Sequence, residues 1–411
     1  MKYFLMLSTL FLVLNVEARV SFSNALREIN KRSTDIPPVI AGVEAAEHFQ
    51  LSKKLKFVPS LAAGYSKSEE FTYSSNTDSL FLKSSFNIFN GGSDYADYQA
   101  GSYNLFASQA KLGKVVLALE NKATVVIVDY LQKSIDKNIY QSIYKTKVKS
   151  LRATRRRFKK GLTPRQEVLK SQVDLGISKA QLNSSKISSF LSRSKLVNLL
   201  GHSQLAVRWP LKNKLKRLNL KRLKSSKLNF DSRPDLLEAK YQMMRDQNNL
   251  KSVKRSFLPK IDFFYTMSAN TSNSVESDTR TSLLTISIPL FSNWQTYSSY
   301  KTAQTTFSSS NYNYKSKMRS AEAEWDALKQ NLADSIHTAR EREANVKISR
   351  SLYRDNFKRF RAGKASVNDL QLDQARLLQA ESQQSSGWAA VHLAFLNYCH
   401  AKGISIVSCD V

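Results

Sequence analysis

The stretch "RRRFKKGLTPRQEVLKSQVDL", Arg155–Leu175, interrupts a region that otherwise has the composition of one long helix. Its Gly161 and Pro164 are residues that commonly end one helix and begin the next. A similar stretch, "KRFRAGKASVNDLQLDQARL", holds Gly363, at an offset of 202 from Gly161. At the same offset, Phe89 of "NIFNGG" corresponds to Phe291 of "IPLFSN". A constant offset over such a long span predicts an internal duplication in which the broken helix belongs to the repeating unit.

The N-terminal segment predicts an export signal. The segment "MKYFLMLSTLFLVLNVEA" holds one basic residue, an uncharged apolar core from Tyr3 to Val16, and a V-E-A ending typical of a cleavage site. We expect a signal peptide over residues 1–18, cut after Ala18. A retained anchor helix is the weaker alternative, because the apolar core is too short to span a bilayer comfortably.

The composition indicates long, solvated helices with an unusual charge. Gly (12) and Pro (8) are scarce in 411 residues, and the formal net charge is +30. Between Gln141 and Phe230, 24 Lys and Arg face two acids, Glu167 and Asp174. Such a balance can indicate nucleic-acid binding. For an exported chain, the positive charge is better explained by binding to an anionic envelope polymer, by contact with lipid headgroups or by the selectivity of a pore. The simplest explanation is a solvated basic surface. We therefore expect no nucleic-acid partner.

Each repeat predicts the same order of elements: a helix, two strands, a very long helix, a turn and a shorter helix. We place the first repeat at 19–206, a basic connector at 207–232, the second repeat at 233–403 and a tail at 404–411. Long helices are expected over 93–160 and 294–362, and shorter ones up to 200 and 402. Hairpin tips are expected at 161–164 and 363–366. Ser232 is the predicted N-cap of the helix that opens the second repeat.

The long helix of the second repeat carries one narrow apolar stripe along a polar rod. Its members keep a spacing of three or four residues, as in a coiled-coil seam. The stripe comprises Trp325, Leu328, Leu332, Ile336, Ala339, Val346, Tyr353, Phe357 and Phe360.

Two pairs of strands, at about 57–89 and 259–291, alternate apolar and polar side chains. Strands of roughly ten residues with one apolar face are typical of a membrane β-barrel, although a hairpin packed on a soluble core gives a similar pattern. Four strands cannot close a barrel, so further copies of the chain must complete it, two giving 8 strands and three giving 12. The residues expected to face lipid are Leu82, Phe86, Ile88, Ile261, Phe263, Tyr265, Ile286, Ile288 and Leu290.

The order "RPDLLEAK", "FLPKIDF", "ISIPLF" and "FRAGKASVNDLQLDQARLLQAE" resembles the TolC-type outer membrane factor family over nearly the whole mature chain. The resemblance implies a mixed α and β membrane protein, a homotrimer whose long α-helical barrel continues a 12-stranded transmembrane β-barrel with four strands per chain. It also implies a periplasmic tunnel that docks an adaptor protein and an inner-membrane efflux or secretion pump.

The resemblance assigns roles to matching positions. The hairpin tips, which would meet the adaptor, are Gly161, Leu162, Thr163, Gly363, Lys364 and Ala365. The pore constriction would involve Asp369, Leu372, Glu167 and Phe360. A ring of three Asp369 side chains would favour cations, whereas the arginines and lysines beside Gly161 oppose that preference. Phe360 takes the place of an aromatic gate residue but has no hydroxyl to donate.

No motif for catalysis, a cofactor or a metal is visible. His392, Cys399 and His400 lack a convincing ligand spacing, and "NGGSD" is a lone Gly pair. Whether Cys399 and Cys409 form a disulfide is left open by the sequence. Besides an export channel, we keep one alternative from another class, a periplasmic coiled-coil protein that binds an anionic envelope polymer; a soluble protein without a barrel would distinguish it.

Overall fold

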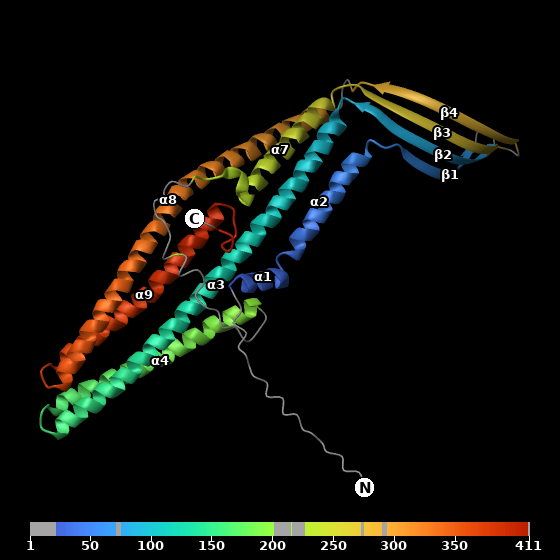
Figure 1. The fold of residues 1–411 in the computed structure, drawn as a ribbon. Coiled ribbons are helices and arrows are strands. Elements are labelled where there is room, and N and C mark those ends of the chain that lie inside the picture. Colours follow the sequence, from blue (N-terminus) through green and yellow to red (C-terminus); the bar gives the residue numbers. More distant parts are fainter. Residues whose placement is uncertain are drawn as a thin grey trace, which may run out of the picture.

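The computed structural model describes residues 22–70, 75–200, 215, 227–272, 275–289 and 294–409. The predicted signal peptide and most of the predicted connector lie outside these residues. The described chain forms a long rod of helices with a four-stranded sheet at one end (Figure 1). Both chain reversals that were predicted from the sequence lie at the opposite end of the rod.

The rod is built from two sets of helices with similar bounds. The first set comprises α1 (Phe22–Arg32), α2 (Pro37–Leu55), α3 (Ser93–Lys159) and α4 (Arg165–Leu200). The second set comprises the short 3₁₀ helix η1 (Phe230–Ser232), α7 (Pro234–Arg255), α8 (Gln295–Arg361) and α9 (Val367–Ala401). Both α3 and α8 have 67 residues, which at 1.5 Å per residue makes each roughly 100 Å long.

The offset of 202 recurs in the helix bounds. It relates both ends of α3 to the corresponding ends of α8, and it relates Arg165, the first residue of α4, to Val367, the first of α9. α2 and α7 pack beside the sheet-proximal halves of the long helices, and α4 and α9 pack beside the distal halves (Figure 1). This correspondence supports the duplication that the sequence predicts.

The apolar stripe of α8 forms the core as predicted. Leu332, Ile336 and Ala339 are fully buried, and Trp325 stacks on Tyr398 of α9 with ring centroids 5.1 Å apart. Apolar residues of α1, α3 and α9 complete the same cluster. A second, smaller cluster around Phe360 lies near the distal end. The rod is therefore held together by narrow apolar contacts along its helices rather than by a wide globular core.

The prediction for Ser232 is wrong, because Arg233 is the N-cap of α7. Ser232 instead ends η1, and its hydroxyl donates to the carbonyl of Lys402 at 2.7 Å. This bond joins the start of α7 to the end of α9. Cys399 and Cys409 form a disulfide that folds the C-terminal tail back onto α9, where Ile406 is buried.

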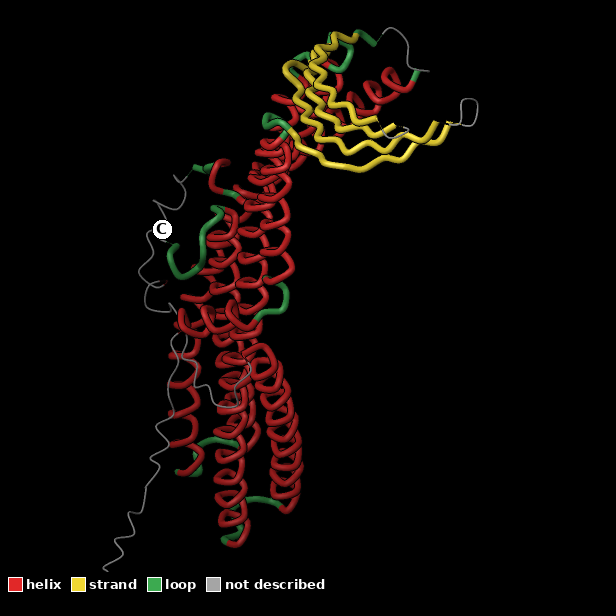
Figure 2. Tube along the Cα trace, turned by 90° about the vertical axis from the view of Figure 1, so that its right-hand side faces the viewer, coloured by secondary structure: helices red, strands yellow, loops and turns green. Residues whose placement is uncertain are grey.

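The sheet is antiparallel in the order β1-β2-β3-β4. Its strands are β1 (Ser60–Glu70), β2 (Ser75–Asn90), β3 (Lys260–Ser272) and β4 (Val275–Ser287). The β2–β3 pairing joins the two repeats, and Figure 2 shows that the sheet is strongly curved. β1 and β4 are its two edges.

The strand predictions need two corrections at their ends. A register shift between Asn87 and Phe89 places Phe89, not Ile88, opposite Ile261, because the ladder skips Ile88 at this irregularity. β4 ends at Ser287, so Ile288 follows the strand instead of lying within it. Leu290 lies outside the described residues.

Candidate functional site

Two regions at opposite ends of the rod hold the residues that the sequence singled out. At the sheet end, cross-strand partners gather the predicted apolar residues on one face. Phe263 pairs with Phe86 on one side and Leu284 on the other, and Ile261 pairs with Ile286. Residues in register share a face of the sheet, and along it Leu284 and Ile286 are 57% and 65% exposed. This face is apolar and uncovered in the single chain.

The other face of the sheet is largely polar. Asn87 donates to the Asp262 carboxylate at 2.6 Å, and the hydroxyls of Ser268 and Thr279 lie 2.6 Å apart. The Lys83 ammonium lies 5.2 Å from the centre of the Phe264 ring. A sheet with one apolar and one hydrogen-bonded polar face suits a boundary between lipid and water.

At the distal end, both hairpin turns use the same cap. Gly161 and Gly363 have φ angles of 68° and 80°, the left-handed region that glycine adopts without strain. Leu162 N–H donates to the Arg157 carbonyl at 3.0 Å, and Lys364 N–H donates to the Arg359 carbonyl at 2.9 Å. These are Schellman caps, so each glycine ends its long helix as predicted.

The six predicted tip residues lie together at this end but are not equally accessible. A Cβ added to either glycine would meet nothing within 4 Å, and Leu162 is 64% exposed. Lys364 is also exposed, and Thr163 is half-buried. Ala365 instead packs against a small buried cluster formed by Phe360, Val367 and Leu370. The open surface of the tips is therefore formed mainly by Gly161, Leu162, Gly363 and Lys364.

Asp369 has a structural role in the single chain. Its carboxylate accepts hydrogen bonds from the Ser366 backbone N–H at 3.2 Å and the Ser366 hydroxyl at 2.7 Å, while the Asp369 N–H donates to the Ser366 hydroxyl oxygen at 3.0 Å. This capping box starts α9. Hydrogen bonds from the Ser366 side chain and backbone lower the pKa of Asp369 from its usual 3.8. The side chain is nevertheless exposed in the single chain.

Phe360, one of the predicted constriction residues, has no exposed side chain in the single chain. Its side chain is fully buried, and the Arg157 guanidinium stacks on its ring at 5.0 Å. Arg157 also donates to the Phe360 carbonyl at 3.2 Å. Of the other predicted constriction residues, Leu372 is 53% exposed, and Glu167 pairs with Lys170 at 3.2 Å.

A buried polar contact between α8 and α9 was missed from the sequence. Asp373 is 2% exposed and accepts from Asn356 of α8 and, at 3.2 Å, from Arg376. At the offset of 202, the matching pair in the first repeat is Thr154 and Ser171, whose hydroxyls lie 3.4 Å apart. Aligning the repeats would have paired these polar positions, which is the signal that could have found the contact.

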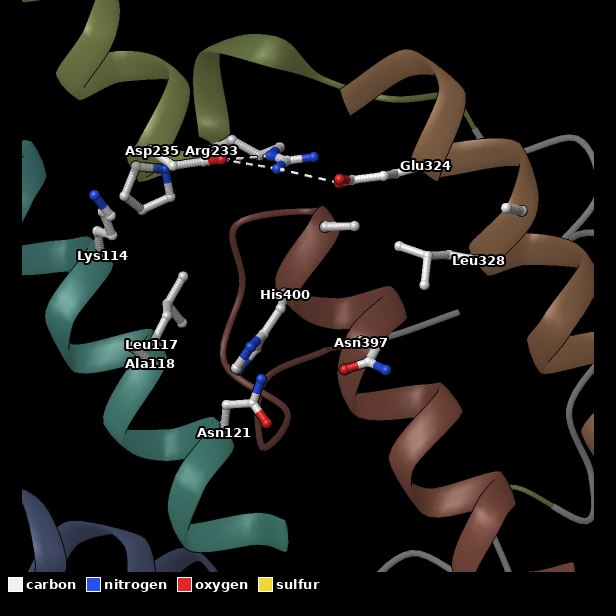
Figure 3. Close-up of a pocket in the computed structure, with 13 residues that line it drawn as sticks. Lys114, Leu117, Ala118, Asn121, Arg233, Asp235, Glu324, Leu328, Asn397 and His400 are labelled. Atoms are coloured by element: carbon white, nitrogen blue, oxygen red, sulfur yellow. Dashed lines mark hydrogen bonds and ion pairs between the residues drawn. The ribbon is translucent and has the colours of Figure 1, made fainter. Parts of the chain in front are cut away.

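A cavity of about 450 Å³ lies where the start of α7 meets the end of α9 (Figure 3). Arg233 pairs with Asp235 at 2.8 Å and reaches Glu324 at 3.9 Å, so its charge is already balanced. Burial lowers the pKa of His400 to about 4, which keeps the imidazole neutral near pH 7. Lys114, which also lines the cavity, pairs with Glu238 at 2.9 Å. The charged groups of the lining are therefore already paired within the protein, and Asn121, Asn397 and His400 are the neutral polar groups beside them.

Within the described ranges, no three His, Cys, Asp or Glu side chains gather as a metal site. Of the helices in those same ranges, none has the length and apolarity needed to cross a membrane.

Comparison with known proteins places this geometry in context. Residues 228–395 match the model of a family described as outer membrane efflux protein. The fold is similar to VceC, an outer membrane protein of Vibrio cholerae, with a TM-score of 0.78 and 15% identity over 93% of this chain and 96% of that chain. No curated protein matches the chain.

Two outer membrane channels give similar values. CmeC of Campylobacter jejuni has a TM-score of 0.78 and 14% identity, covering 94% of this chain and 87% of that one. MtrE of Neisseria gonorrhoeae has a TM-score of 0.75 and 16% identity, covering 93% and 88%. The family match over residues 228–395 and the shared fold confirm the resemblance to TolC-type outer membrane factors, and the family description agrees with the predicted outer-membrane location.

Proposed function

Starting from this family match, we propose that the chain is the channel subunit of a tripartite efflux or type I secretion system. In this proposal three copies form the channel, and substrates pass through it passively after delivery by an inner-membrane pump and a periplasmic adaptor. The chain itself performs no chemistry and needs no cofactor. The pump determines the substrate, so the same channel serves small compounds or proteins.

The observation that carries this proposal is a curved sheet with two open edges on a rod roughly 100 Å long. In lipid, each unpaired backbone N–H or C=O group of a strand edge costs several kcal/mol. β1 and β4 therefore need partner strands in the membrane. Three copies of four strands give a closed barrel of twelve. The apolar face, with Leu82, Phe263 and Ile286 among its exposed members, would then contact lipid.

The rod would cross the periplasm and present its tips to the adaptor. In support, Gly161, Leu162, Gly363 and Lys364 form an open surface at the end farthest from the sheet. The tip glycines let the chain reverse without side chains that would block a docking helix. Asp369, Leu372 and Glu167 follow within the first turns of α4 and α9 and would line the entrance.

Single-channel conductance of the detergent-purified mature protein in a planar bilayer tests the channel directly. Discrete current steps are expected. Under a salt gradient, the sign of the reversal potential tells whether the Asp369 carboxylates or the surrounding arginines select the ion. A protein that stays soluble without detergent and never conducts would overturn the proposal in favour of a periplasmic polymer-binding protein.

Adaptor docking is tested at the two tip glycines. Replacing both Gly161 and Gly363 by bulky residues should abolish export while the oligomer still assembles in the outer membrane, because an added Cβ at either position would meet open space. Normal export by this double variant would exclude the tips as the docking surface.

A further inference from the structure

The distal half of the rod contains one seam that is covered and an equivalent one that is not. The covered seam lies between α3 and the α8–α9 hairpin. Ile139 of α3 shares a cavity with Glu381 and Trp388 of α9. Ala153 of α3 packs against the buried cluster that contains Phe360 and Val367.

The offset of 202 relates each residue of this covered seam to one elsewhere in the chain. The α3 positions correspond to positions on α8, and the α9 positions correspond to positions on α4. α4 and α8 are the two outer helices of the distal half, since α4 packs on α3 and α8 packs on α9.

Burial differs sharply between the corresponding positions. On α9, Gln374, Ser385 and Trp388 are 7%, 5% and 2% exposed. Their counterparts on α4 are Gln172, Asn183 and Lys186, and all three are exposed. Likewise, Phe360 is fully buried, whereas its counterpart Phe158 is 44% exposed. The repeats therefore leave half of an equivalent seam uncovered on each outer helix.

We propose that α8 of one copy packs on α4 of the next copy in the same way that α3 packs on α9 within one chain. This inference rests on the proposed multimeric channel and adds the residues that form its contacts. The occupant is a second copy of this chain, because its α4 carries the counterparts of the α9 residues that cover α3 within one chain.

Charge complementarity supports this occupant. Ile139 corresponds to Glu341 on α8, and the cavity partners of Ile139, Glu381 and Trp388, correspond to Lys179 and Lys186 on α4. Glu341 would then lie between two lysines of the next copy. All three side chains are exposed in the single chain.

The offset of 202 also predicts a second ion pair between copies, near the tip. Ala153 corresponds to Asp355, and its partner Val367 corresponds to Arg165. Asp355 of one copy would therefore pair with Arg165 of the next. Part of the dense positive charge of the first repeat would in this way be balanced by acids of the second repeat.

An aromatic contact completes the seam. Within one chain, Arg157 stacks on Phe360 at 5.0 Å. The offset relates Arg157 to Arg359 and Phe360 to Phe158, so Arg359 of one copy would cover the exposed Phe158 ring of the next. A guanidinium on an aromatic ring is favourable, more so once it is removed from water.

Disulfide trapping tests the seam. Asp355→Cys with Arg165→Cys should, on oxidation, give chains linked to one another as dimers and trimers on a non-reducing gel. The matched control, Ala153→Cys with Val367→Cys, occupies the corresponding place within one chain and should close without linking chains. Asp355→Cys alone should give no trimer.

Charge reversal provides a second measurement in the purified full chain. Glu341→Lys should weaken assembly about tenfold, because like charges across an interface are costly. Adding Lys179→Glu and Lys186→Glu should restore it. Assembled trimers that conduct but show neither the linked chains nor the rescue would overturn the seam and leave the channel intact. A chain that remains monomeric and never conducts would overturn both proposals.

Discussion

The helices α3, α8 and α9 each end in a glycine with a left-handed backbone conformation, but the surroundings of the three glycines differ. Gly161, Gly363 and Gly403 have φ angles of 68°, 80° and 72°. At the two tips an added Cβ would meet open space. At Gly403 it would lie 2.0 Å from the carbonyl oxygen of Ser232. The backbone conformation is thus the same, but only Gly403 is also required for close packing of α9 against the start of α7.

We therefore predict that Gly403→Ala destabilises the protein much more than Gly363→Ala. The left-handed conformation alone should cost about 1 kcal/mol in each variant. The overlap with Ser232 should add about 2–3 kcal/mol for Gly403→Ala. Denaturant unfolding of both variants with the disulfide intact measures the difference, and equal losses would contradict the close approach at Gly403.

A second residue-scale prediction concerns the capping box of α9. The pKa of Asp369 is lower in the folded state than its usual 3.8. A lowered pKa means that its contribution to stability is present above about pH 4 and is lost as the pH falls through the folded value. Asp369→Asn should therefore lower the thermal midpoint at neutral pH. The difference from the wild type should shrink on acidification, and a gap that stays constant with pH would argue against the cap.

At the scale of the element, the α8–α9 hairpin contains the buried carboxylate of Asp373. The α3–α4 hairpin has the hydroxyls of Thr154 and Ser171 at the corresponding positions. Asp373→Ala should cost about 2–3 kcal/mol, because Asn356 loses a buried acceptor and a buried cavity remains. The matched change, Ser171→Ala, removes a 3.4 Å contact between hydroxyls and should cost about 1 kcal/mol. Unfolding free energies of the two variants give the comparison, and a larger loss for Ser171→Ala would contradict it.

The elements and the glycine-capped ends of the long helices were largely predictable, whereas the start of α7 and the end of β4 were not. The alternation of the strands and the stripe from Trp325 to Phe360 depend on local spacing, which the sequence displays directly. The N-cap of α7 and the end of β4 depend on partners distant in sequence. Ser232, for example, bonds to Lys402 instead of capping its own helix.

The site was harder to predict for a related reason. The resemblance to the family assigned Phe360 to the pore constriction from its sequence position alone. In the structure, residues of α3 and α9 bury its ring. Arg157, a single residue in a basic run, covers it. Pairwise packing between helices that are far apart in the sequence is not visible in the local pattern.

At the scale of the whole molecule, the offset of 202 also predicts how the proposed barrel would close. Within one chain β2 pairs with β3, and Leu82 lies opposite Met267. The corresponding strands are β4 and β1, and the corresponding residues are Leu284 and Tyr65. β4 of one copy should therefore pair with β1 of the next with Leu284 opposite Tyr65. Both side chains are exposed in the single chain, at 57% and 62%.

This register also accounts for the early end of β4. Phe86 lies opposite Phe263, and the same transfer puts Ile288 opposite Leu61 of the next copy. Pairing there would extend β4 beyond Ser287, to the length that the sequence alternation predicts. Tyr65→Cys with Leu284→Cys should link chains on oxidation, since opposed Cβ atoms lie about 5 Å apart. Leu82→Cys with Met267→Cys is the control that closes within one chain. If Tyr65→Cys combined with Ser282→Cys or with Ile286→Cys links chains more readily than Tyr65→Cys with Leu284→Cys, the strands pair two residues out of the predicted register.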